Sequence, residues 1–272
     1  MRRTVTLATT LIAGWVLIAA AQQPSVLPMG PARERGTSIT PAYEGWYKND
    51  DGSFSMLIGY YNRNSKEALT IPVGPNNKVE PGEADQGQPT FFESGRQWGV
   101  FVIKVPKDFG TKTIKWTLVA NGETQSVPFT LNAGYPITPF KELGMGNQPP
   151  TLWFTADGPK VTGPPTSVAG SFTGAVNQPV QLTVFADDVK EKESKAVNVA
   201  TVSWHKHRGP GNVTFARARV PVPKAGEPAT VAATFSAPGE YLLRVQANDE
   251  SGEGGGGFQC CWTNTYVTVV IK

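Results

Sequence analysis

Apolar and polar residues alternate in short runs along most of the chain, and a period of two predicts β-strands rather than helices. In the first half, residues 54–61 (FSMLIGYY) form a strand pattern that is apolar on both faces, and residues 100–105 (VFVIKV) form another. No long run with a helical period separates them. The pattern therefore predicts an all-β first half.

The most specific local signal is the pair Asn121-Gly122, which tolerates the positive φ angles of a type I′ turn. Residues 113–120 and 124–131 flank this pair. We therefore predict a β-hairpin here, with Ile114, Trp116 and Leu118 together on its core face.

The second half contains strand patterns that are apolar on one face only. They cover residues 180–186, 200–205, 241–247 and 267–271. Trp204 lies on the apolar side of one run, and Tyr241 opens another. A sandwich with a Trp in an inner strand and a Tyr at the start of a later strand is the immunoglobulin-like arrangement.

Segments rich in turn residues divide the chain. Residues 74–90 predict a long loop, and residues 132–150 carry no strand period. Pro149 and Pro150 have no N–H to donate to a ladder. We expect a first β-sandwich domain over residues 37–135, a Gly/Pro-rich linker over residues 136–150 and a second, immunoglobulin-like β-sandwich domain over residues 151–272.

Composition agrees with an all-β fold of short strands joined by turns, because Gly and Pro supply 29 and 23 of the 272 residues. Aromatic residues make up 10%, which argues against a disordered chain. The formal net charge is +3, and Arg2 and Arg3 supply two of these charges. A nearly neutral chain has no electrostatic reason to bind nucleic acid or an anionic membrane.

The first 21 residues have the pattern of a secretory signal peptide. Arg2 and Arg3 precede an apolar run over residues 5–18, and three alanines then give a small-residue cleavage pattern before Gln22. An uncleaved anchor is the alternative, since the apolar stretch reaches the lower limit for a span. No other segment could cross a membrane. We expect export to the periplasm or cell surface, with a polar tether over residues 22–36.

Two stretches of the second half carry longer motifs. They are residues 202–215 (VSWHKHRGPGNVTF) and 233–249 (ATFSAPGEYLLRVQAND), and residues 147–150 (NQPP) precede them. The first stretch resembles the W-x-K-x-x-G-P-G-x-V-x-F segment of PKD and cadherin-like repeats of bacterial exported proteins. The second resembles the A-x-F-x-x-P-G-x-Y-x-L-x-V-x-A-x-D segment of the same repeats. Residues 147–150 resemble the usual entry into such a repeat. The Gly-rich insert over residues 253–258 and the cysteine pair that follows it depart from that pattern. The resemblance implies a fold used in spacers, adhesion modules and carbohydrate-associated modules.

Motifs for catalysis are absent from the sequence, which has no G-x-S-x-G elbow, P-loop, dinucleotide fingerprint or H-E-x-x-H. The two histidines, His205 and His207, are two apart on a predicted strand and therefore share a face. Because Trp204 faces the core, we predict exposed histidines on the outer face, with a pair that binds one metal ion as the alternative. We expect no enzyme activity.

Acidic residues follow two of the predicted strands. Asp187 and Asp188 end one strand pattern, and Asp249 and Glu250 end another. In an immunoglobulin-like sandwich these strands run in the same sense in opposite sheets, so their ends meet at one pole. Carboxylates there suit Ca²⁺, a cation that prefers oxygen ligands; solvated turn acids are the alternative. The loops 189–198 and 251–259 belong to the same pole, which is our best candidate for binding another molecule.

Cys260 and Cys261 are adjacent and are the only cysteines. Export favours oxidation, but adjacent Cα atoms lie only about 3.8 Å apart across a trans peptide, below the usual disulfide span. A strained vicinal disulfide, two buried or free thiols, and a link to another chain all remain open.

Aromatic residues are frequent in the first half, and sugar rings stack on aromatic side chains. The candidates for a carbohydrate-binding face are Trp46, Tyr47, Tyr60, Tyr61 and Trp98. The alternative is that most of them fill the core of a small β domain.

These features together predict a non-catalytic exported envelope protein that acts as a binding, adhesion or structural module, or as an accessory subunit of a larger envelope assembly. Its expected partner is another envelope protein, or cell-wall or polysaccharide material. A calcium- or other metal-binding surface protein and an accessory module of a polysaccharide-acting enzyme system are the alternatives.

Overall fold

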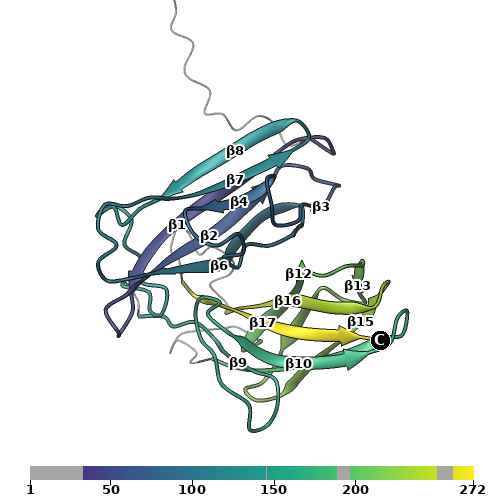
Figure 1. Cartoon of the computed structure of the whole chain (residues 1–272). Helices are drawn as coiled ribbons and strands as arrows, with labels where there is room; N and C mark the ends of the chain where they lie inside the picture. Colours follow the sequence, from purple (N-terminus) through teal and green to yellow (C-terminus); the bar gives the residue numbers. More distant parts are fainter. Residues whose placement is uncertain (1–32, 145, 189–196, 250–259) are drawn as a thin grey trace, which may run out of the picture. The chain divides into compact units, whose positions relative to one another are not determined.

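Strands account for every regular element of the chain that the structure, a computed structural model, describes (Figure 1). The described residues are 33–144, 146–188, 197–249 and 260–272, and they belong to one compact unit. The predicted signal peptide and most of the predicted tether lie outside them. None of the described residues forms a helix that is long and apolar enough to cross a membrane.

The first half folds into a sandwich of antiparallel sheets. One sheet has the order β1-β2-β6 and another the order β4-β7-β8, while β3 and β5 form a separate pair. The strands are β1 (Ile39–Lys48), β2 (Phe54–Asn62), β3 (Leu69–Thr70), β4 (Asn77–Glu80), β5 (Phe91–Phe92), β6 (Gly95–Val105), β7 (Ile114–Ala120) and β8 (Glu123–Phe129).

The predicted hairpin is present in this sandwich, with β7 in the middle of its sheet and β8 at the edge. Strands β7 and β8 pair from Ile114 with Phe129 to Ala120 with Glu123, and Asn121 and Gly122 have φ angles of 51° and 79°. Both angles are positive, as a type I′ turn requires. Trp116 is fully buried, and the ring of Phe101 meets its indole edge-on at 5.0 Å. The hairpin prediction is therefore confirmed.

Four strands of the first half, namely β1, β3, β4 and β5, are not indicated by a period of two in the sequence. Strand β1 contains Pro41, and its register shifts between Tyr43 and Gly45, so its exposed and buried positions do not alternate evenly. Strand β4 lies inside residues 74–90, which were predicted as one long loop; that prediction is wrong for Asn77–Glu80, which pair with β7. A strand so short gives little period to detect.

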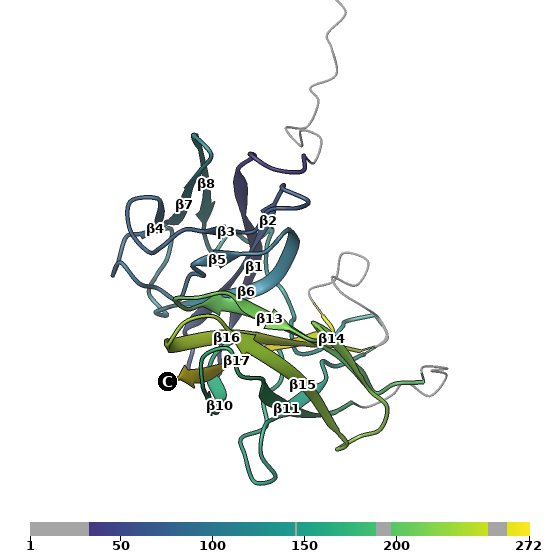
Figure 2. The ribbon, with the colours of Figure 1, turned by 90° about the vertical axis from the view of Figure 1, so that its right-hand side faces the viewer.

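The second half is a sandwich of a five-stranded and a four-stranded sheet (Figure 2). The five-stranded sheet has the order β10-β17-β16-β12-β14, in which β10 runs parallel to β17, and the four-stranded sheet has the order β13-β15-β11-β9. The strands are β9 (Thr151–Trp153), β10 (Val168–Gly174), β11 (Val180–Asp187), β12 (Ala200–Arg208), β13 (Val213–Phe215), β14 (Arg219–Val222), β15 (Pro228–Phe235), β16 (Gly239–Asn248) and β17 (Trp262–Ile271).

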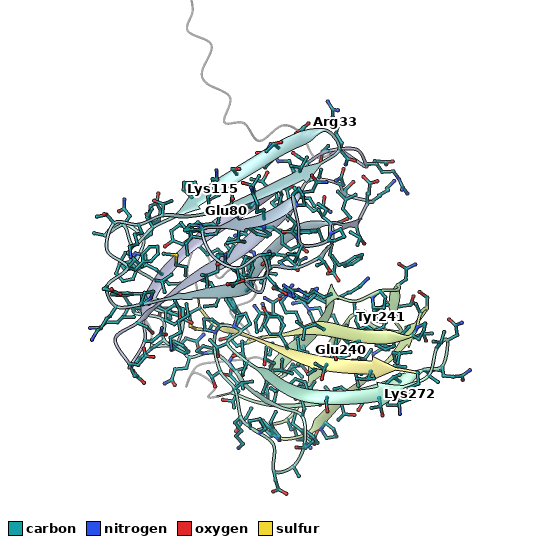
Figure 3. The ribbon with its side chains drawn as sticks, in the orientation of Figure 1. Arg33, Glu80, Lys115, Glu240, Tyr241 and Lys272 are labelled. Atoms are coloured by element: carbon teal, nitrogen blue, oxygen red, sulfur yellow. A yellow bond between two sulfur atoms is a disulfide. The ribbon has the colours of Figure 1, made fainter. Side chains whose placement is uncertain are left out.

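The residues that predicted an immunoglobulin-like sandwich occupy the expected positions. Trp204 is 1% exposed between the sheets. Tyr241 is buried while its neighbour Glu240 is exposed, as strand geometry requires (Figure 3). The Tyr241 hydroxyl donates to the carbonyl of Ala237 at 2.8 Å, which is the tyrosine-corner contact of such sandwiches. The chain is thus all-β, with two β-sandwiches of which the second is immunoglobulin-like.

The segment after β8 is attached to the first sandwich. The amide of Trp46 donates to the Tyr135 carbonyl at 3.0 Å, and the amide of Ile137 donates to the Trp46 carbonyl at 2.8 Å. These two bonds satisfy backbone groups along β1. Part of the predicted linker therefore runs beside β1 as an added, parallel segment.

Candidate functional site at the junction of the two sandwiches

Polar side chains line the outer face of the five-stranded sheet, and they are buried. His205, Arg244 and Tyr266 are cross-strand neighbours on β12, β16 and β17. Arg244 is 2% exposed and Tyr266 is 9% exposed, although neither faces the sandwich core. They are covered because residues 85–100 of the first sandwich contact them. We call this set of contacts, between residues 85–100 and the outer face of β12, β16 and β17, the junction.

Arg208 at the end of β12 binds the loop 84–89 of the first sandwich. Its two terminal nitrogens donate to the two carboxylate oxygens of Asp85 at 2.6 and 2.7 Å. Its Nε also donates to the Gln88 carbonyl at 2.9 Å. The hydrogen bonds from Arg208 lower the pKa of the Asp85 carboxyl, and burial opposes them only in part. This forked contact fixes both distance and orientation.

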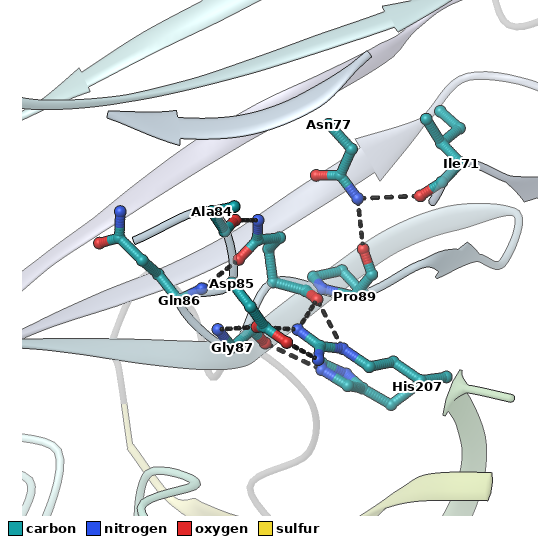
Figure 4. Close-up of polar contacts among 10 residues, drawn as sticks. Ile71, Asn77, Ala84, Asp85, Gln86, Gly87, Pro89 and His207 are labelled. Atoms are coloured by element: carbon teal, nitrogen blue, oxygen red, sulfur yellow. Dashed lines mark hydrogen bonds and ion pairs between the residues drawn. The ribbon is translucent and has the colours of Figure 1, made fainter. Parts of the chain in front are cut away.

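The loop is shaped before it meets Arg208. Gln88 is fully buried and its side-chain amide donates to the Ala84 carbonyl at 2.8 Å. Asn77 donates to the Pro89 carbonyl at 2.7 Å (Figure 4). It also accepts from the Trp116 indole at 2.9 Å. Buried amides that replace a backbone ladder in this way keep an irregular loop rigid.

His207 lies at the centre of the contact with this loop. Its Nε2 is 3.0 Å from the Gly87 carbonyl, and its ring centroid is 4.8 Å from that of Tyr266. The backbone carbonyl of His207 accepts from the Thr90 amide at 3.1 Å. Burial, reinforced by the charge of Arg208, lowers the pKa of His207 from 6.5 to about 3. The imidazole is therefore neutral over the physiological range.

His205 forms a hydrogen bond with Glu93 across the junction. Its Nδ1 is 2.6 Å from a carboxylate oxygen of Glu93, and the Lys206 amide donates to the other oxygen at 3.3 Å. The Glu93 amide in turn donates to the Tyr60 hydroxyl at 2.9 Å. Burial alone would raise the pKa of Glu93, but His205, followed by Arg244, outweighs it and the pKa is lowered.

Strand β6 meets β16 and β17 through side chains. Arg244 donates to the side-chain oxygens of Gln97 and Asn264. Asn264 donates to the Gly99 carbonyl at 3.1 Å, and the Tyr266 hydroxyl donates to the Val100 carbonyl at 2.6 Å. The backbone of β6 is thus bonded to side chains of the second sandwich.

The buried carboxylate of Glu44 binds β6 on the side away from the second sandwich. Glu44 accepts from the Gly99 amide at 2.8 Å and from Arg96 at 2.6 Å. Burial raises the pKa of Glu44, and the Arg96 charge only partly offsets this. Gly99 has a φ of 52°, and a Cβ on it would lie 2.1 Å from the Trp262 ring. Only glycine permits this approach of β6 to β17.

The predicted exposure of the histidines is wrong: His207 is 1% exposed, and the side chain of His205 is 15% exposed. The predicted face was right, since both histidines lie opposite Trp204, but the first sandwich covers that face. The sequence could not show this cover. A signal was present nonetheless: the outer positions of β16 and β17 carry Arg244, Gln246 and Asn264, residues with high hydrogen-bonding capacity. Asp85, Glu93 and Arg208 carried no comparable signal.

The five aromatic candidates for sugar binding do not form one face. Tyr47 and Tyr60 are 5% and 3% exposed and belong to the packed interior. Trp46, Tyr61 and Trp98 are half-buried. Trp46 donates to the Asn132 carbonyl at 2.8 Å, and Trp98 lies 3.9 Å from the Arg96 guanidinium. Each of these two rings therefore already has a partner on at least one side.

The predicted metal ligands are only partly described, because Glu250 lies outside the described residues. Asp187 and Asp188 line a hollow of about 140 Å³ together with Gln148, and Asp249 accepts from the neighbouring Asn147 at 2.5 Å. Within the described residues, no three His, Cys, Asp or Glu side chains come together as a metal site. The calcium site stays a prediction. Of the two loops predicted at this pole, most of 189–198 and all of 251–259 lie outside the described residues.

Cys260 and Cys261 form a vicinal disulfide, one of the three arrangements that the sequence left open. Both residues are buried, at 4% and 1% exposed. They immediately precede Trp262, whose ring packs on Gly99. The disulfide therefore lies at the entry of β17 into the junction.

The first sandwich also has a hollow on its surface, apart from the junction. It has a volume of about 440 Å³ and is lined by residues 69–76 and 119–121. Pro72, Val73 and Pro75 give it an apolar wall, and Asn76 and Asn121 add amides. A small ligand or an extended chain could fit in a hollow of this size.

Comparisons with known proteins identify no family, since no protein-family model and no curated protein matches the chain. Among solved structures, the D00-D0 domain of intimin has a TM-score of 0.28 at 11% identity, over 86% of this chain and 100% of that one. The adhesin InvE of Yersinia pseudotuberculosis has a TM-score of 0.25 at 14% identity, over 88% of this chain and 61% of that one. The titin Ig tandem A164-A165 has a TM-score of 0.22 at 12% identity, over 87% of this chain and 99% of that one. Likenesses this weak carry no argument about function.

Proposed function

We propose that this protein is an exported, non-catalytic binding, adhesion or structural module in which the two sandwiches act as one rigid unit. The junction is the observation that supports this. Two tandem domains that only share a linker move independently by default. Here directional bonds from Arg208, Arg244 and Asn264 reach the first sandwich, and each needs a defined geometry.

Rigidity suits a module that presents loops. Binding residues are commonly carried on loops that a rigid scaffold positions. The junction covers the surfaces where the two sandwiches meet. The hollow at residues 69–76 and the pole near Asp187 lie apart from it and are accessible to a partner. The proposed partner is another envelope protein, or cell-wall or polysaccharide material.

The test is recovery of the tagged protein, without residues 1–21, from the envelope fraction of its source, read by mass spectrometry. We expect either one protein in stoichiometric amount or retention on cell-wall or polysaccharide material. The hollow is probed with Val73→Asp, which places a charge in its apolar wall, and the matched control is Lys224→Asp on an exposed turn. Loss of binding with the first variant alone supports the hollow as the contact.

Two results would contradict the proposal. One is that no protein or polysaccharide is retained, in an experiment in which circular dichroism shows the tagged chain to be folded. The other is substrate turnover in a screen of hydrolase substrates, which would place the protein among enzymes. Retention by both variants at wild-type level would move the contact away from the hollow while leaving the module proposal intact.

A further inference from the structure

We propose that the junction is acid-sensitive, and that protonation of His207 releases the loop 84–89 and strand β6 from the outer face of the second sandwich. This inference goes beyond the proposed function, because it concerns how the two sandwiches are held and does not depend on the partner. It rests on the position of one imidazole between the sandwiches, on the charges around it and on the atoms it bonds.

The tautomer of His207 follows from its partner. The Gly87 oxygen is a carbonyl and can only accept, so Nε2 carries the proton and donates to it. The nitrogen that would take up a second proton is therefore Nδ1. In the described part of the chain, Nδ1 is buried and has no hydrogen-bond partner. A proton added there has no acceptor among the described residues to stabilise it.

The charges that face His207 also disfavour a second proton. Arg208 follows it on β12, and Arg244 comes from β16. The loop contributes Asp85, whose two carboxylate oxygens already bind Arg208. From β17 the neutral ring of Tyr266 packs on the imidazole. Protonation would thus add a third positive charge beside a single carboxylate that is already paired.

The direction of the pH effect follows from the depressed pKa. In the closed junction the pKa of His207 is about 3, and an exposed imidazole has a pKa of 6.5. The open form therefore binds one more proton between these values. The closed form is fully favoured above pH 6.5, and its ratio to the open form falls about tenfold for each pH unit below that.

The other carboxyls of the junction affect its opening in a different pH range or in the opposite direction. The pKa of Glu93 is lowered, so its contribution is lost only below the ordinary value of 4.5. The pKa of Glu44 is raised, so acid favours the state in which it is buried. Of these groups, His207 alone favours opening between pH 6.5 and 4.5.

Amide hydrogen exchange of the intact chain tests the proposal. The Thr90 amide reports the junction, because it donates to the His207 carbonyl. The amides of Trp116 and Leu182 report the two cores. From about pH 7 to about pH 4.5, after correction for intrinsic exchange, we expect Thr90 to lose protection about 100-fold while the core amides keep theirs.

Two matched variants identify the histidine responsible. His207→Gln keeps a side-chain donor for the Gly87 carbonyl but cannot titrate, so Thr90 should stay protected at both pH values. His205→Gln removes the pair with Glu93 and should lower Thr90 protection at both pH values while the acid-dependent loss persists. Unchanged protection of Thr90 in the wild type, or a full acid response in His207→Gln, would overturn the proposal.

A second measurement applies if His207→Gln does not fold. The chain has only two histidines, so their imidazole signals can be assigned in a nuclear magnetic resonance titration. We expect the His207 signal to remain that of a neutral ring until the Thr90 amide loses protection. Titration of His207 near pH 6.5 while Thr90 stays protected would also overturn the proposal.

Discussion

The two faces of the five-stranded sheet are both buried, but by different chemistry. On the inner face, Trp204, Val245 and Val267 pack among apolar side chains. On the outer face, Arg244 and Asn264 are as well buried, and they bind polar groups of the first sandwich. The first kind of burial depends on area and shape. The second depends on donors and acceptors meeting at the right distance. One sheet therefore joins a core that depends on close packing to a junction that depends on paired donors and acceptors.

The largest effect should come from the inner face. Trp204→Ala removes a fully buried indole that contacts the rings of Phe154 and Phe172. The free energy of unfolding should fall by about 3–5 kcal/mol, measured by urea denaturation. Trp204→Phe keeps most of the volume and should cost clearly less. Equal costs for the two variants would mean that this position is not close-packed.

A smaller but specific effect is expected from the outer face. Arg244→Met keeps the bulk of the side chain but leaves the side-chain oxygens of Gln97 and Asn264 without their donor. The expected loss is about 1–3 kcal/mol in urea denaturation, because buried acceptors lose their partner. The matched control is Arg219→Met on β14, where the arginine is exposed and the change should stay within about 0.5 kcal/mol. Equal effects would remove the distinction between the buried and the exposed arginine.

At the rim of the junction the effect should be smaller again. Arg208→Lys keeps the charge but cannot make the forked contact with Asp85. Because the Asp85 side chain is 57% exposed, solvent screens the pair, and we expect a loss below about 1 kcal/mol. The pKa of Asp85, lowered by Arg208, should rise toward its ordinary value in a carbon-detected titration. An unchanged Asp85 pKa would show that the forked contact is not what lowers it.

An effect of about the same size as that at the rim is expected at the predicted calcium site, which belongs to neither face. If Asp187, Asp188, Asp249 and Glu250 bind Ca²⁺ with the weak affinity of extracellular modules, about 1 mM Ca²⁺ should stabilise the fold by about 0.4–1.4 kcal/mol. Thermal unfolding with Ca²⁺ and with a chelator measures this, and Asp187→Asn should abolish it. No shift in melting temperature would remove the calcium prediction.

Alternation along the strands predicted much of the fold, because a half-buried strand records in its sequence which face is apolar. It placed Trp204 inward and the histidines outward correctly. It could not predict what covers the outer face, since the cover comes from residues 85–100, which are more than a hundred positions away in the chain. Strand β1 was missed because its bulge interrupts the period. The vicinal disulfide was one of three arrangements that adjacent cysteines allow.

The way in which the second sandwich covers the edge of strand β6 has a consequence for how the two sandwiches evolve. One of its edges pairs with β2, and on the other side its carbonyls accept from Asn264 and Tyr266 of the second sandwich. A gene fragment encoding only the first sandwich would produce a protein with this edge uncovered, and open edges template aggregation. Recombination within residues 136–150 would therefore be selected against. We expect the two sandwiches to be inherited together, as one cassette, rather than shuffled as separate repeats.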